Sequence, residues 1–330
     1  MKKVFLALIC CLALTACSND APTPQSAAQP ASGTAAPNAT QDSAGNLALS
    51  LRLGVMPSMD YLPLAVALRE GYCAEEKLTL ELVKFYSAND RDAALQSGSI
   101  DGAVIDLTGA LLQKAGGFDV KLTSRCNAPF YVVAGQKSGI TAPEQMKGTK
   151  LAVSRNTVID YLLDRALAAA NLTPDDVEKV EINKIPLRFE MLQSGDIDIT
   201  GLPDPLALMA SRAGNAVLAT NRTLGFDVTG IVFRQEALNA SGEAVRAMYR
   251  AYNRGAAYLR DNPVATVHDI LTTEMGYPEA LLSFATIPGY DEATAPRDED
   301  MRAVSAWLEE RGLIPAGFDP LSAVDGAFVR

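Results

Sequence analysis

A seven-residue stretch that occurs twice constrains the fold of this chain more than any other feature of its sequence. The stretch LQSGSID at 95–101 returns as LQSGDID at 192–198, 97 residues later. The chain before each stretch is similar too, since the run at 53–62 is echoed at 151–162. An interval this long indicates two duplicated lobes, because solenoid repeats are far shorter. Two lobes imply a cleft between them.

Short apolar runs alternate with helical patterns in both copies, which predicts an α/β fold. Gly98 and Gly195 stand where a helix would end in a left-handed residue. In the first copy we expect strands at 49–55, 79–85 and 100–105, and helices at 62–70 and 91–96. In the second copy we expect strands at 150–153, 177–185 and 197–202, and helices at 158–170 and 188–193. This order builds a mostly parallel sheet flanked by helices in each lobe.

The rest of the chain completes one of the lobes. Strand character recurs at 121–134 and 228–233, and helices are expected at 244–260, 263–272 and 298–311. We therefore assign 49–132 and 232–330 to a discontinuous lobe 1, and 133–231 to lobe 2. The two crossings, near 130–137 and 228–234, would form a hinge.

The first 48 residues have the pattern of an export signal and a tether. Lys2 and Lys3 precede an apolar run at 4–14 that is too short to span a bilayer. The run ends in LTAC, which looks like a bacterial lipobox, so we expect a signal peptide at 1–16 and lipid on Cys17. The alternative is an ordinary signal peptide and a protein free in the periplasm. Residues 17–48 are rich in Ala, Pro, Ser and Thr, as in a flexible linker.

Composition excludes several classes of function. The formal net charge is −10, and loss of Lys2 and Lys3 would make it −12, which disfavours nucleic acid and anionic membrane surfaces. After the lipobox only Cys73 and Cys126 remain, which either pair or stay as two buried thiols. His268 is the sole histidine, and its place in a predicted helix favours a structural role. We expect no metal site, no cofactor and no catalytic residue.

Several further stretches carry a family resemblance. The chain resembles the periplasmic solute-binding proteins of ABC importers, in the nitrate, sulfonate, taurine and thiamine-pyrimidine (SsuA/THI5-like) group. The resemblance covers nearly everything after Leu49. It is carried by 63–72, both copies of the repeated heptad, 131–134, 146–150, 202–205 and Trp307-Leu308.

The resemblance implies a two-lobed periplasmic-binding-protein fold of type II and a role in capture. The protein would be a monomer outside the cytoplasm, held to the cell membrane by lipid on Cys17 (on the periplasmic face if the cell is Gram-negative). It would deliver a small solute to a permease powered by a separate ATPase. Which membrane carries the lipid is left open.

The resemblance also places the ligand against loops that follow strands, and open parallel sheets bind ligands at the same edge. These loops lie at 57–61, 86–89, 106–108, 127–130, 154–157 and 202–204. The candidate ligand-binding residues are Ser58, Asp60, Tyr61, Asn89, Asp106, Asn127, Arg155, Asn156, Thr157 and Asp204. Ser58 and Thr157 have an alternative role as helix caps, and Asp204 as part of a rigid turn. The repeated heptad itself is expected to be scaffold.

Two features of these loops point to different ligands. Helix N-termini favour an anion such as a sulfonate or nitrate. Asp60, Asp106 and Asp204 favour a nitrogenous group, and with tyrosines nearby we prefer a nitrogenous, pyrimidine-like organic solute. Two further classes remain as alternatives: a sensor that docks on a membrane receptor and, least favoured, an enzyme on the same fold, because that chemistry usually needs more than a lone histidine.

Overall fold

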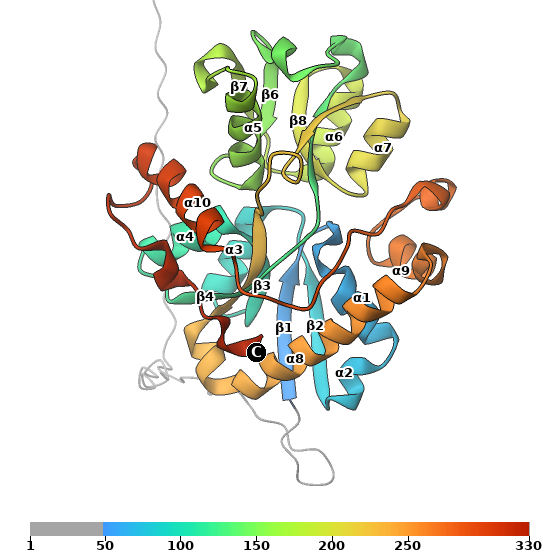
Figure 1. Ribbon diagram of the computed structural model, residues 1–330, viewed down its shortest axis with the longest axis vertical. Coiled ribbons are helices and arrows are strands. Elements are labelled where there is room, and N and C mark those ends of the chain that lie inside the picture. The colour runs from blue at the N-terminus through green and yellow to red at the C-terminus, as the bar shows by residue number, and fades with distance from the viewer. Residues whose placement is uncertain (1–48, 330) are drawn as a thin grey trace, which may run out of the picture. The chain divides into compact units, whose positions relative to one another are not determined.

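The computed structural model describes residues 49–329, which contain two five-stranded sheets (Figure 1). The first sheet has the order β2-β1-β3-β10-β4, and the second has the order β7-β6-β8-β5-β9. Their strands are β1 (Leu49–Val55), β2 (Leu78–Lys84), β3 (Gly102–Asp106), β4 (Val120–Arg125), β10 (Thr229–Arg234), and β5 (Phe130–Ala134), β6 (Lys150–Val153), β7 (Glu178–Glu181), β8 (Ile199–Pro203), β9 (Ala216–Thr220). We call each sheet with its helices the first and the second lobe. The expected two-lobed α/β fold is confirmed.

Each sheet contains one strand that runs against the others. β1 pairs in parallel with β2 and β3, while β10 is antiparallel to β3 and β4. In the second sheet β6 pairs in parallel with β7 and β8, while β5 is antiparallel to β8 and β9. The antiparallel strand is in each case the first strand after the chain has crossed from the other lobe.

The crossings therefore lie a few residues earlier than predicted. The chain passes between the sheets at 126–129 and 221–228, and the predicted positions were 130–137 and 228–234. The predicted boundaries after residues 132 and 231 cut through β5 and β10. The predicted strand region at 121–134 is in fact two strands, one in each sheet. Fully buried strands read as continuous apolar runs, so the pattern does not say which sheet takes them.

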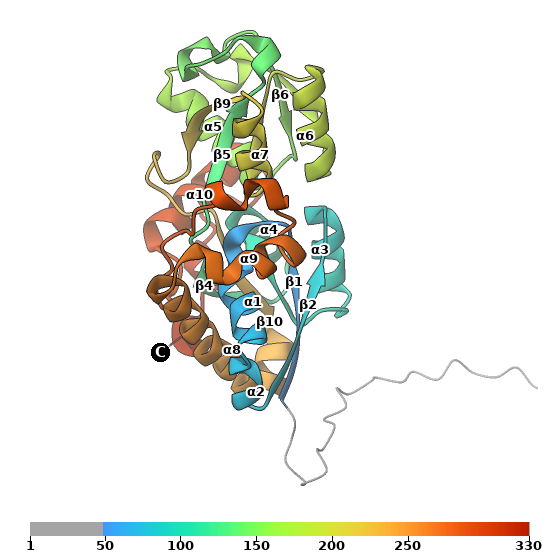
Figure 2. The same cartoon turned by 90° about the vertical axis from the view of Figure 1, so that its right-hand side faces the viewer.

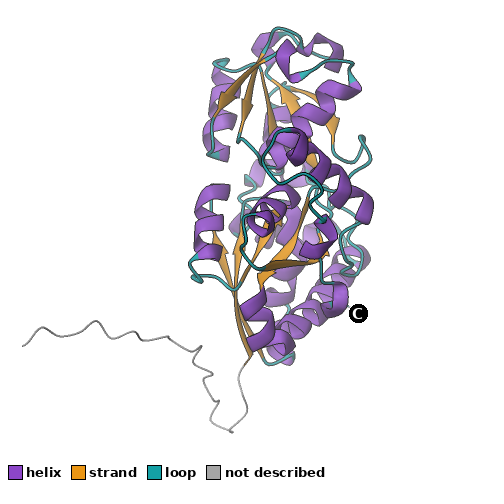
Figure 3. Cartoon of the chain, turned by 90° about the vertical axis from the view of Figure 1, so that its left-hand side faces the viewer, coloured by secondary structure: helices purple, strands orange, loops and turns teal. Residues whose placement is uncertain are grey.

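Helices cover both faces of each sheet (Figure 3). In the first lobe these are α1 (Leu62–Arg69), α2 (Tyr72–Glu75), α3 (Ala88–Gln96), α4 (Leu107–Ala115), α8 (Gln235–Asp261), α9 (His268–Thr273) and α10 (Asp298–Glu310). In the second they are α5 (Val158–Ala169), α6 (Ile185–Ser194) and α7 (Leu206–Arg212). Short 3-10 turns are η1 (Met59–Tyr61), η2 (Gln136–Ser138), η3 (Pro143–Met146), η4 (Pro174–Asp176), η5 (Val264–Val267), η6 (Glu279–Phe284), η7 (Pro320–Ala323) and η8 (Gly326–Phe328).

Some of these elements differ from the sequence-based expectation. Both α3 and α6 begin three residues before the predicted starts at Arg91 and Arg188, so each arginine lies inside its helix. β7 ends at Glu181, before the predicted end at residue 185. Helices α4 and α7 and strand β9 were not predicted.

The repeated heptad forms the same scaffold in both lobes. Gly98 and Gly195 have φ of 75° and 80°, the left-handed conformation that ends α3 and α6. The final aspartate of each heptad accepts a hydrogen bond from the start of the neighbouring strand. The N–H of Arg52 donates to the Asp101 carboxylate and the N–H of Lys150 donates to that of Asp198, both over 2.8 Å. The expected scaffold role is confirmed.

The C-terminal helix α10 joins the lobes. α8 packs along α1 on the first lobe (Figure 2), and α10 packs against α4 of the same lobe (Figure 1). From α10, the indole N–H of Trp307 donates to Asp164 of α5 over 2.9 Å, so α10 contacts both lobes. No helix between residues 49 and 329 is long and apolar enough to cross a membrane. The predicted signal peptide, Cys17 and the linker lie outside the described residues.

Candidate functional site

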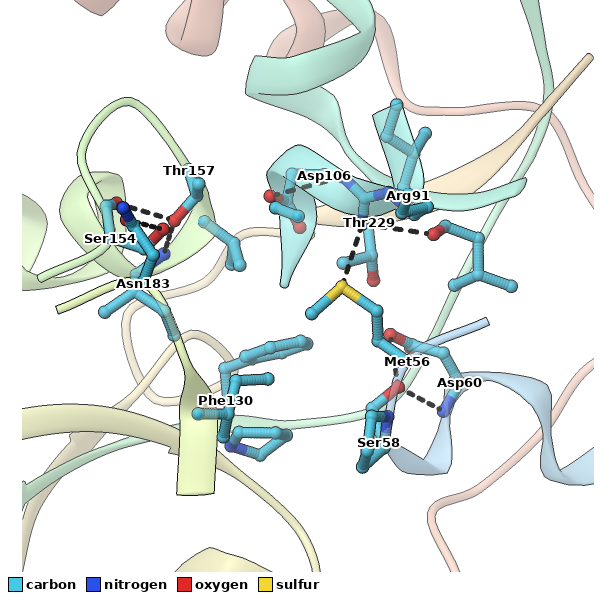
Figure 4. A pocket seen from close by; sticks show the side chains of 18 of the residues that line it. Met56, Ser58, Asp60, Arg91, Asp106, Phe130, Ser154, Thr157, Asn183 and Thr229 are labelled. Atoms are coloured by element: carbon cyan, nitrogen blue, oxygen red, sulfur yellow. Dashed lines mark hydrogen bonds and ion pairs between the residues drawn. The ribbon is translucent and has the colours of Figure 1, made fainter. Parts of the chain in front are cut away.

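A narrow cavity of about 40 Å³ lies between the two lobes (Figure 4). The carboxyl ends of β1, β3 and β8 and the loops after β6 and β7 open into it. We call it the inter-lobe cavity. Its lining is Met56, Pro57, Ser58, Asp60, Ala88, Arg91, Val104, Ile105, Asp106 and Thr229 from the first lobe, and Phe130, Ser154, Thr157, Val158, Ile159, Asn183, Ile185, Arg188 and Pro203 from the second.

Asp60 links the first-lobe wall of the cavity to a crossing segment. Its side chain is 1% exposed, and its Oδ1 accepts the N–H of Ala128 over 3.1 Å. The Ser58 hydroxyl donates to its Oδ2 over 3.3 Å. Burial raises the pKa of Asp60 to about 7, against the lowering effect of these hydrogen bonds. Asp60 therefore keeps its proton to a higher pH than an ordinary aspartate does.

The second-lobe wall presents the N-terminus of α5. The Thr157 hydroxyl accepts the N–H of Ile159 as a helix cap and donates to the carbonyl of Ser154 over 2.8 Å. The Ser154 hydroxyl donates to Asn183 Oδ1 over 3.0 Å. This end of the helix adds a positive partial charge to the cavity.

Two buried arginines face the cavity, one from each lobe. Arg91 of α3 is 2% exposed and Arg188 of α6 is 1% exposed. They lie 97 residues apart, the spacing of the repeated heptad, so they occupy equivalent positions in the two lobes. Burying a guanidinium group lowers the stability of the fold unless a negative charge pairs with it and its N–H groups find hydrogen-bond acceptors.

The two arginines have different hydrogen-bond and ion-pair partners. Arg91 donates through Nε to Asp92 over 2.8 Å and through Nη1 to the carbonyl of Val104 over 3.3 Å, while its Nη2 has no hydrogen-bond partner and lies 3.9 Å from Asp106. Arg188 donates through Nη1 to the carbonyl of Ile182 over 2.9 Å, and its Nε has no partner. Within residues 49–329, no carboxylate lies within ion-pair distance of Arg188.

Burial changes the acidity of these groups without removing the arginine charge. Burial lowers the pKa of Arg188 to about 10, and nearby Asp106 opposes that fall, so Arg188 stays cationic at neutral pH. Burial raises the pKa of Asp106, and Arg91 opposes the rise. The cavity lining thus holds two positive charges, Arg91 and Arg188, and two carboxyl groups, Asp60 and Asp106.

Four of the ten predicted site residues line the inter-lobe cavity, namely Ser58, Asp60, Asp106 and Thr157. Three others, Asn89, Arg155 and Asn156, line an adjoining opening that shares Asp106 and Thr157. Arg155 is exposed and pairs with Glu181 over 3.3 Å. These three residues lie beside the cavity and do not line it.

The remaining three predicted residues make contacts away from the inter-lobe cavity. The Tyr61 hydroxyl donates to the carbonyl of Glu274 over 2.8 Å. Asp204 accepts the Tyr131 hydroxyl and the N–H of Leu208, each over 3.1 Å. Asn127 lies in a separate opening, where its carbonyl accepts a bond from Arg222. These three residues do not line the inter-lobe cavity, and protein groups bond the polar side-chain atoms of Tyr61 and Asp204. Their role in ligand binding stays a prediction.

Sequence reasoning missed Arg91 and Arg188, although a signal was present. Each arginine stands four residues before the first leucine of its heptad, which places it on the buried face of the same helix as Leu95 or Leu192. A cation repeated on a buried helix face would have pointed to the cavity. Asn183 was also missed, because the strand was predicted to continue through it.

Cys73 and Cys126 are both buried free thiols. Between residues 49 and 329, no group of three or more histidine, cysteine, aspartate or glutamate side chains is arranged to hold a metal ion.

Comparison with known proteins identifies the family. The model of the family described as NMT1/THI5 like matches residues 58–266, which is more than half of the chain. The chain belongs to the NMT1/THI5-like family. The matched segment includes the equivalent arginines and nearly all of the cavity lining.

Individual proteins related to this NMT1/THI5-like chain include binding proteins. It is 26% identical over 271 residues to the riboflavin-binding protein RibY of Chloroflexus aurantiacus, covering 80% of this chain and 75% of RibY. The ligand-binding component of an ABC-type import system from Staphylococcus aureus superposes with a TM-score of 0.72 at 18% identity, covering 85% of this chain and 98% of that one. The periplasmic aliphatic sulphonate-binding protein SsuA of Escherichia coli superposes with a TM-score of 0.68 at 19% identity, covering 84% of this chain and 92% of SsuA. The two structures show the fold.

Proposed function

We propose that this NMT1/THI5-like chain is the extracytoplasmic substrate-binding component of an ABC importer. It captures a small organic solute in the inter-lobe cavity and delivers it to a permease powered by a separate ATPase. The observation that carries this proposal is the cavity itself, which both lobes line and which lies beside the two crossing segments. Such an arrangement lets the lobes open and close around a solute.

The relatives and the start of the chain support this role. RibY is named as a riboflavin-binding protein, and the Staphylococcus aureus structure is titled a component of an ABC-type import system. The predicted signal peptide at 1–16 and the lipobox at Cys17 would hold the monomer to a membrane outside the cytoplasm. Residues 17–48 would then be a tether that lets the folded part reach the permease.

The cavity fits binding better than catalysis. Among its described lining residues there is no histidine or cysteine. The hydroxyls of Ser58, Ser154 and Thr157 donate to Asp60, Asn183 and the Ser154 carbonyl, and the Thr229 hydroxyl has no hydrogen-bond partner among the described residues. Among these described hydroxyls only that of Ser58 donates to a carboxyl group, Asp60, over 3.3 Å, which is longer than the contact by which a base activates a nucleophile. We propose that the chain releases its solute unchanged.

The nitrogenous ligand has lost part of its support. Asp204 does not line the cavity, and Asp60 is already bonded to Ala128 and Ser58. Asp106 remains, but it lies 3.9 Å from Arg91 Nη2 and its charge also acts on Arg188. The charged groups of the cavity therefore favour the alternative ligand, an anion, over the nitrogenous solute.

Native mass spectrometry of the full chain after exposure to a small-molecule extract of its host tests the proposal. We expect a bound small molecule on the wild type and none on Asn183→Trp, because the indole would fill the cavity. The matched control is Lys184→Trp, since Lys184 is the next residue and is exposed. Equal retention by both variants would place the solute elsewhere, and no retained solute on the wild type would contradict capture.

Delivery is tested separately with the permease and ATPase of the same organism in proteoliposomes. Solute-loaded chain should stimulate ATP hydrolysis, whereas loaded Asn183→Trp should not. Retention of a solute without any stimulation would favour a sensor that docks on a different membrane receptor.

A further inference from the structure

We propose that α10 is a latch, a helix of the first lobe that holds the second lobe closed through Asp164 before any solute is captured. The inference goes beyond the proposed function, because it concerns how the lobes are held together and not what they bind. α10 lies beside the junction of the lobes, on the left in Figure 1.

The first step is the small volume of the inter-lobe cavity. Its 40 Å³ has room for only a few water molecules, because one water needs roughly 10–15 Å³ of such space. Pockets for drug-sized organic ligands are about 300–1,000 Å³. The lobes must therefore move apart before an organic solute can enter, and contacts of the protein itself hold them in the arrangement described here.

The second step is the carboxyl group that α10 holds. Asp164 of α5 is 8% exposed and accepts the indole N–H of Trp307 over 2.9 Å. Arg311, the residue that follows α10, pairs with the same carboxyl group. Hydrogen bonds to an ionised group are roughly twice as strong as neutral ones. Both donors come from the C-terminal part of the first lobe and the acceptor comes from the second lobe, so separation of the lobes breaks both contacts.

The third step is the balance of charge around Asp164. Lys179 of β7 pairs with both Asp160 and Asp164, and both aspartates are buried. With Arg311 in place, two cations face two carboxylates. Without it, Lys179 alone serves both carboxylates, and an incompletely paired buried charge is unfavourable. Release of α10 therefore leaves the second lobe short of one positive charge.

The fourth step is the apolar contact around the latch. The rings of Trp307 and Tyr161 meet edge to face with centroids 5.4 Å apart, and Tyr161 meets Phe226 of the second crossing in the same way at 5.3 Å. The Arg311 guanidinium lies 4.2 Å from the centre of the Trp307 ring. The three aromatic rings belong to one continuous apolar cluster that includes side chains of α4 and α5. Opening of the latch would expose this surface to water, which is unfavourable.

A second contact between the lobes, formed by α7 and η6, is weaker. Arg212 at the end of α7 lies over the ring of Phe284 in η6, 3.7 Å from its centre. Phe284 is 44% exposed, and Arg212 is exposed as well. A cation–π contact is weaker in water than in a buried site. The latch is therefore the stronger of these two contacts.

The test uses the purified full chain without a solute. Small-angle X-ray scattering measures the separation of the lobes, and acrylamide quenching measures access to Trp307, the sole tryptophan of the chain. Arg311→Gln should enlarge the radius of gyration and at least double the quenching constant. Arg311→Lys should lie between Arg311→Gln and the wild type, because the charge is kept.

Scattering is the deciding measurement, since loss of the stacked guanidinium by itself exposes the indole. The matched control is Arg302→Gln, the same substitution on the exposed face of α10, where Arg302 forms no ion pair within residues 49–329. It should scatter as the wild type does. Arg212→Gln removes the second contact and should enlarge the radius less than Arg311→Gln.

An unchanged radius of gyration in Arg311→Gln would overturn the inference, and so would an equal or larger increase in Arg212→Gln. If circular dichroism shows that Arg311→Gln does not fold, Trp307→Phe takes its place. That variant keeps a ring against Tyr161 and loses only the donor to Asp164, so it should also enlarge the radius, and an unchanged radius would contradict the latch. Because no solute is present, capture is tested only by the extract experiment and stands or falls separately.

Discussion

The two lobes share a scaffold and differ in their charges. Both end the helix before the heptad with a left-handed glycine, and both tie a strand to the final aspartate over 2.8 Å. The first-turn aspartates, in contrast, have different partners. Asp160 of α5 accepts a bond from Lys179 at 2.5 Å, while Asp60 of η1 has no basic partner and instead accepts the N–H of Ala128.

The two equivalent arginines also differ in their partners, but here it is the residue of the first lobe that has an oppositely charged partner. Arg91 in the first lobe has a carboxylate partner, and Arg188 in the second lobe has none among residues 49–329. Residues that hold a strand or a helix end have kept their contacts in both copies, whereas residues that face the cavity have not. Asp60 and Arg188, which have no oppositely charged partner within residues 49–329, both line the inter-lobe cavity. A ligand bound there could supply the missing partner.

The largest expected loss of stability comes from a substitution in α8 that affects the first lobe alone. α8 has no counterpart in the second lobe, and its Gly255 lies so close to α1 that an added Cβ would stand 2.1 Å from the carbonyl oxygen of Pro63. Gly255→Ala must push the helices apart, and we expect a loss of about 3 kcal/mol of unfolding free energy. Urea unfolding measures the loss, and hydrogen exchange should rise in β1 before it rises in β6.

The control for this substitution lies on the same helix. At Gly242 the nearest atom to an added Cβ is 3.4 Å away, on the ring of Phe328. Alanine is favoured over glycine in a helix by about 1 kcal/mol. Gly242→Ala should therefore be neutral or stabilising. Equal stability of the two variants would show that α8 and α1 do not pack as closely as described.

The next effect contrasts the equivalent aspartates. Asp160→Asn leaves the largely buried Lys179 with only Asp164 as a charge partner, and should cost roughly 2 kcal/mol. Asp60→Asn removes a carboxyl group that is buried without a basic partner, and should stabilise the protein at pH 8. Urea titration of both variants at that pH measures the difference. An equal loss of unfolding free energy in both variants would mean that Asp60 and Asp160 are stabilised by their surroundings to the same extent.

The pH dependence sharpens the same contrast. The folded pKa of Asp60 is about 7 and its ordinary value is 3.8, so between these values the unfolded chain has released a proton that the folded chain still holds. Stability from this group therefore falls as pH rises, by about 1.4 kcal/mol per pH unit, and is constant above pH 7. Asp60→Asn should remove that slope. A wild-type slope that persists in the variant would assign it to another group.

The repeat made much of this fold predictable. The 97-residue spacing predicted two similar sheets, and the glycines and aspartates of the heptad were assigned to scaffold because their chemistry is local in the chain. The β5 and β10 assignments failed because a buried strand carries no mark of the sheet that receives it. The cavity was predicted in part: Ser58 and Thr157 follow strands, but Tyr61 and Asp204 follow strands as well and turn to Glu274 and Tyr131.

The smallest effect tests whether the scaffolds are as alike as they look. Asp101→Ala and Asp198→Ala each remove one charge-assisted hydrogen bond to a strand N–H, and each should cost about 1–2 kcal/mol. Asp101→Ala should lower the free energy of unfolding slightly more, because Asp101 also lies 3.6 Å from Arg234, whereas Asp198 has no such pair within residues 49–329. Urea unfolding of the two variants at one pH gives the comparison. Because both lobes depend on this bond in the same way, a difference of several kcal/mol would mean that the duplication no longer supports the two sheets equally, and the equivalence of Arg91 and Arg188 would lose its structural basis.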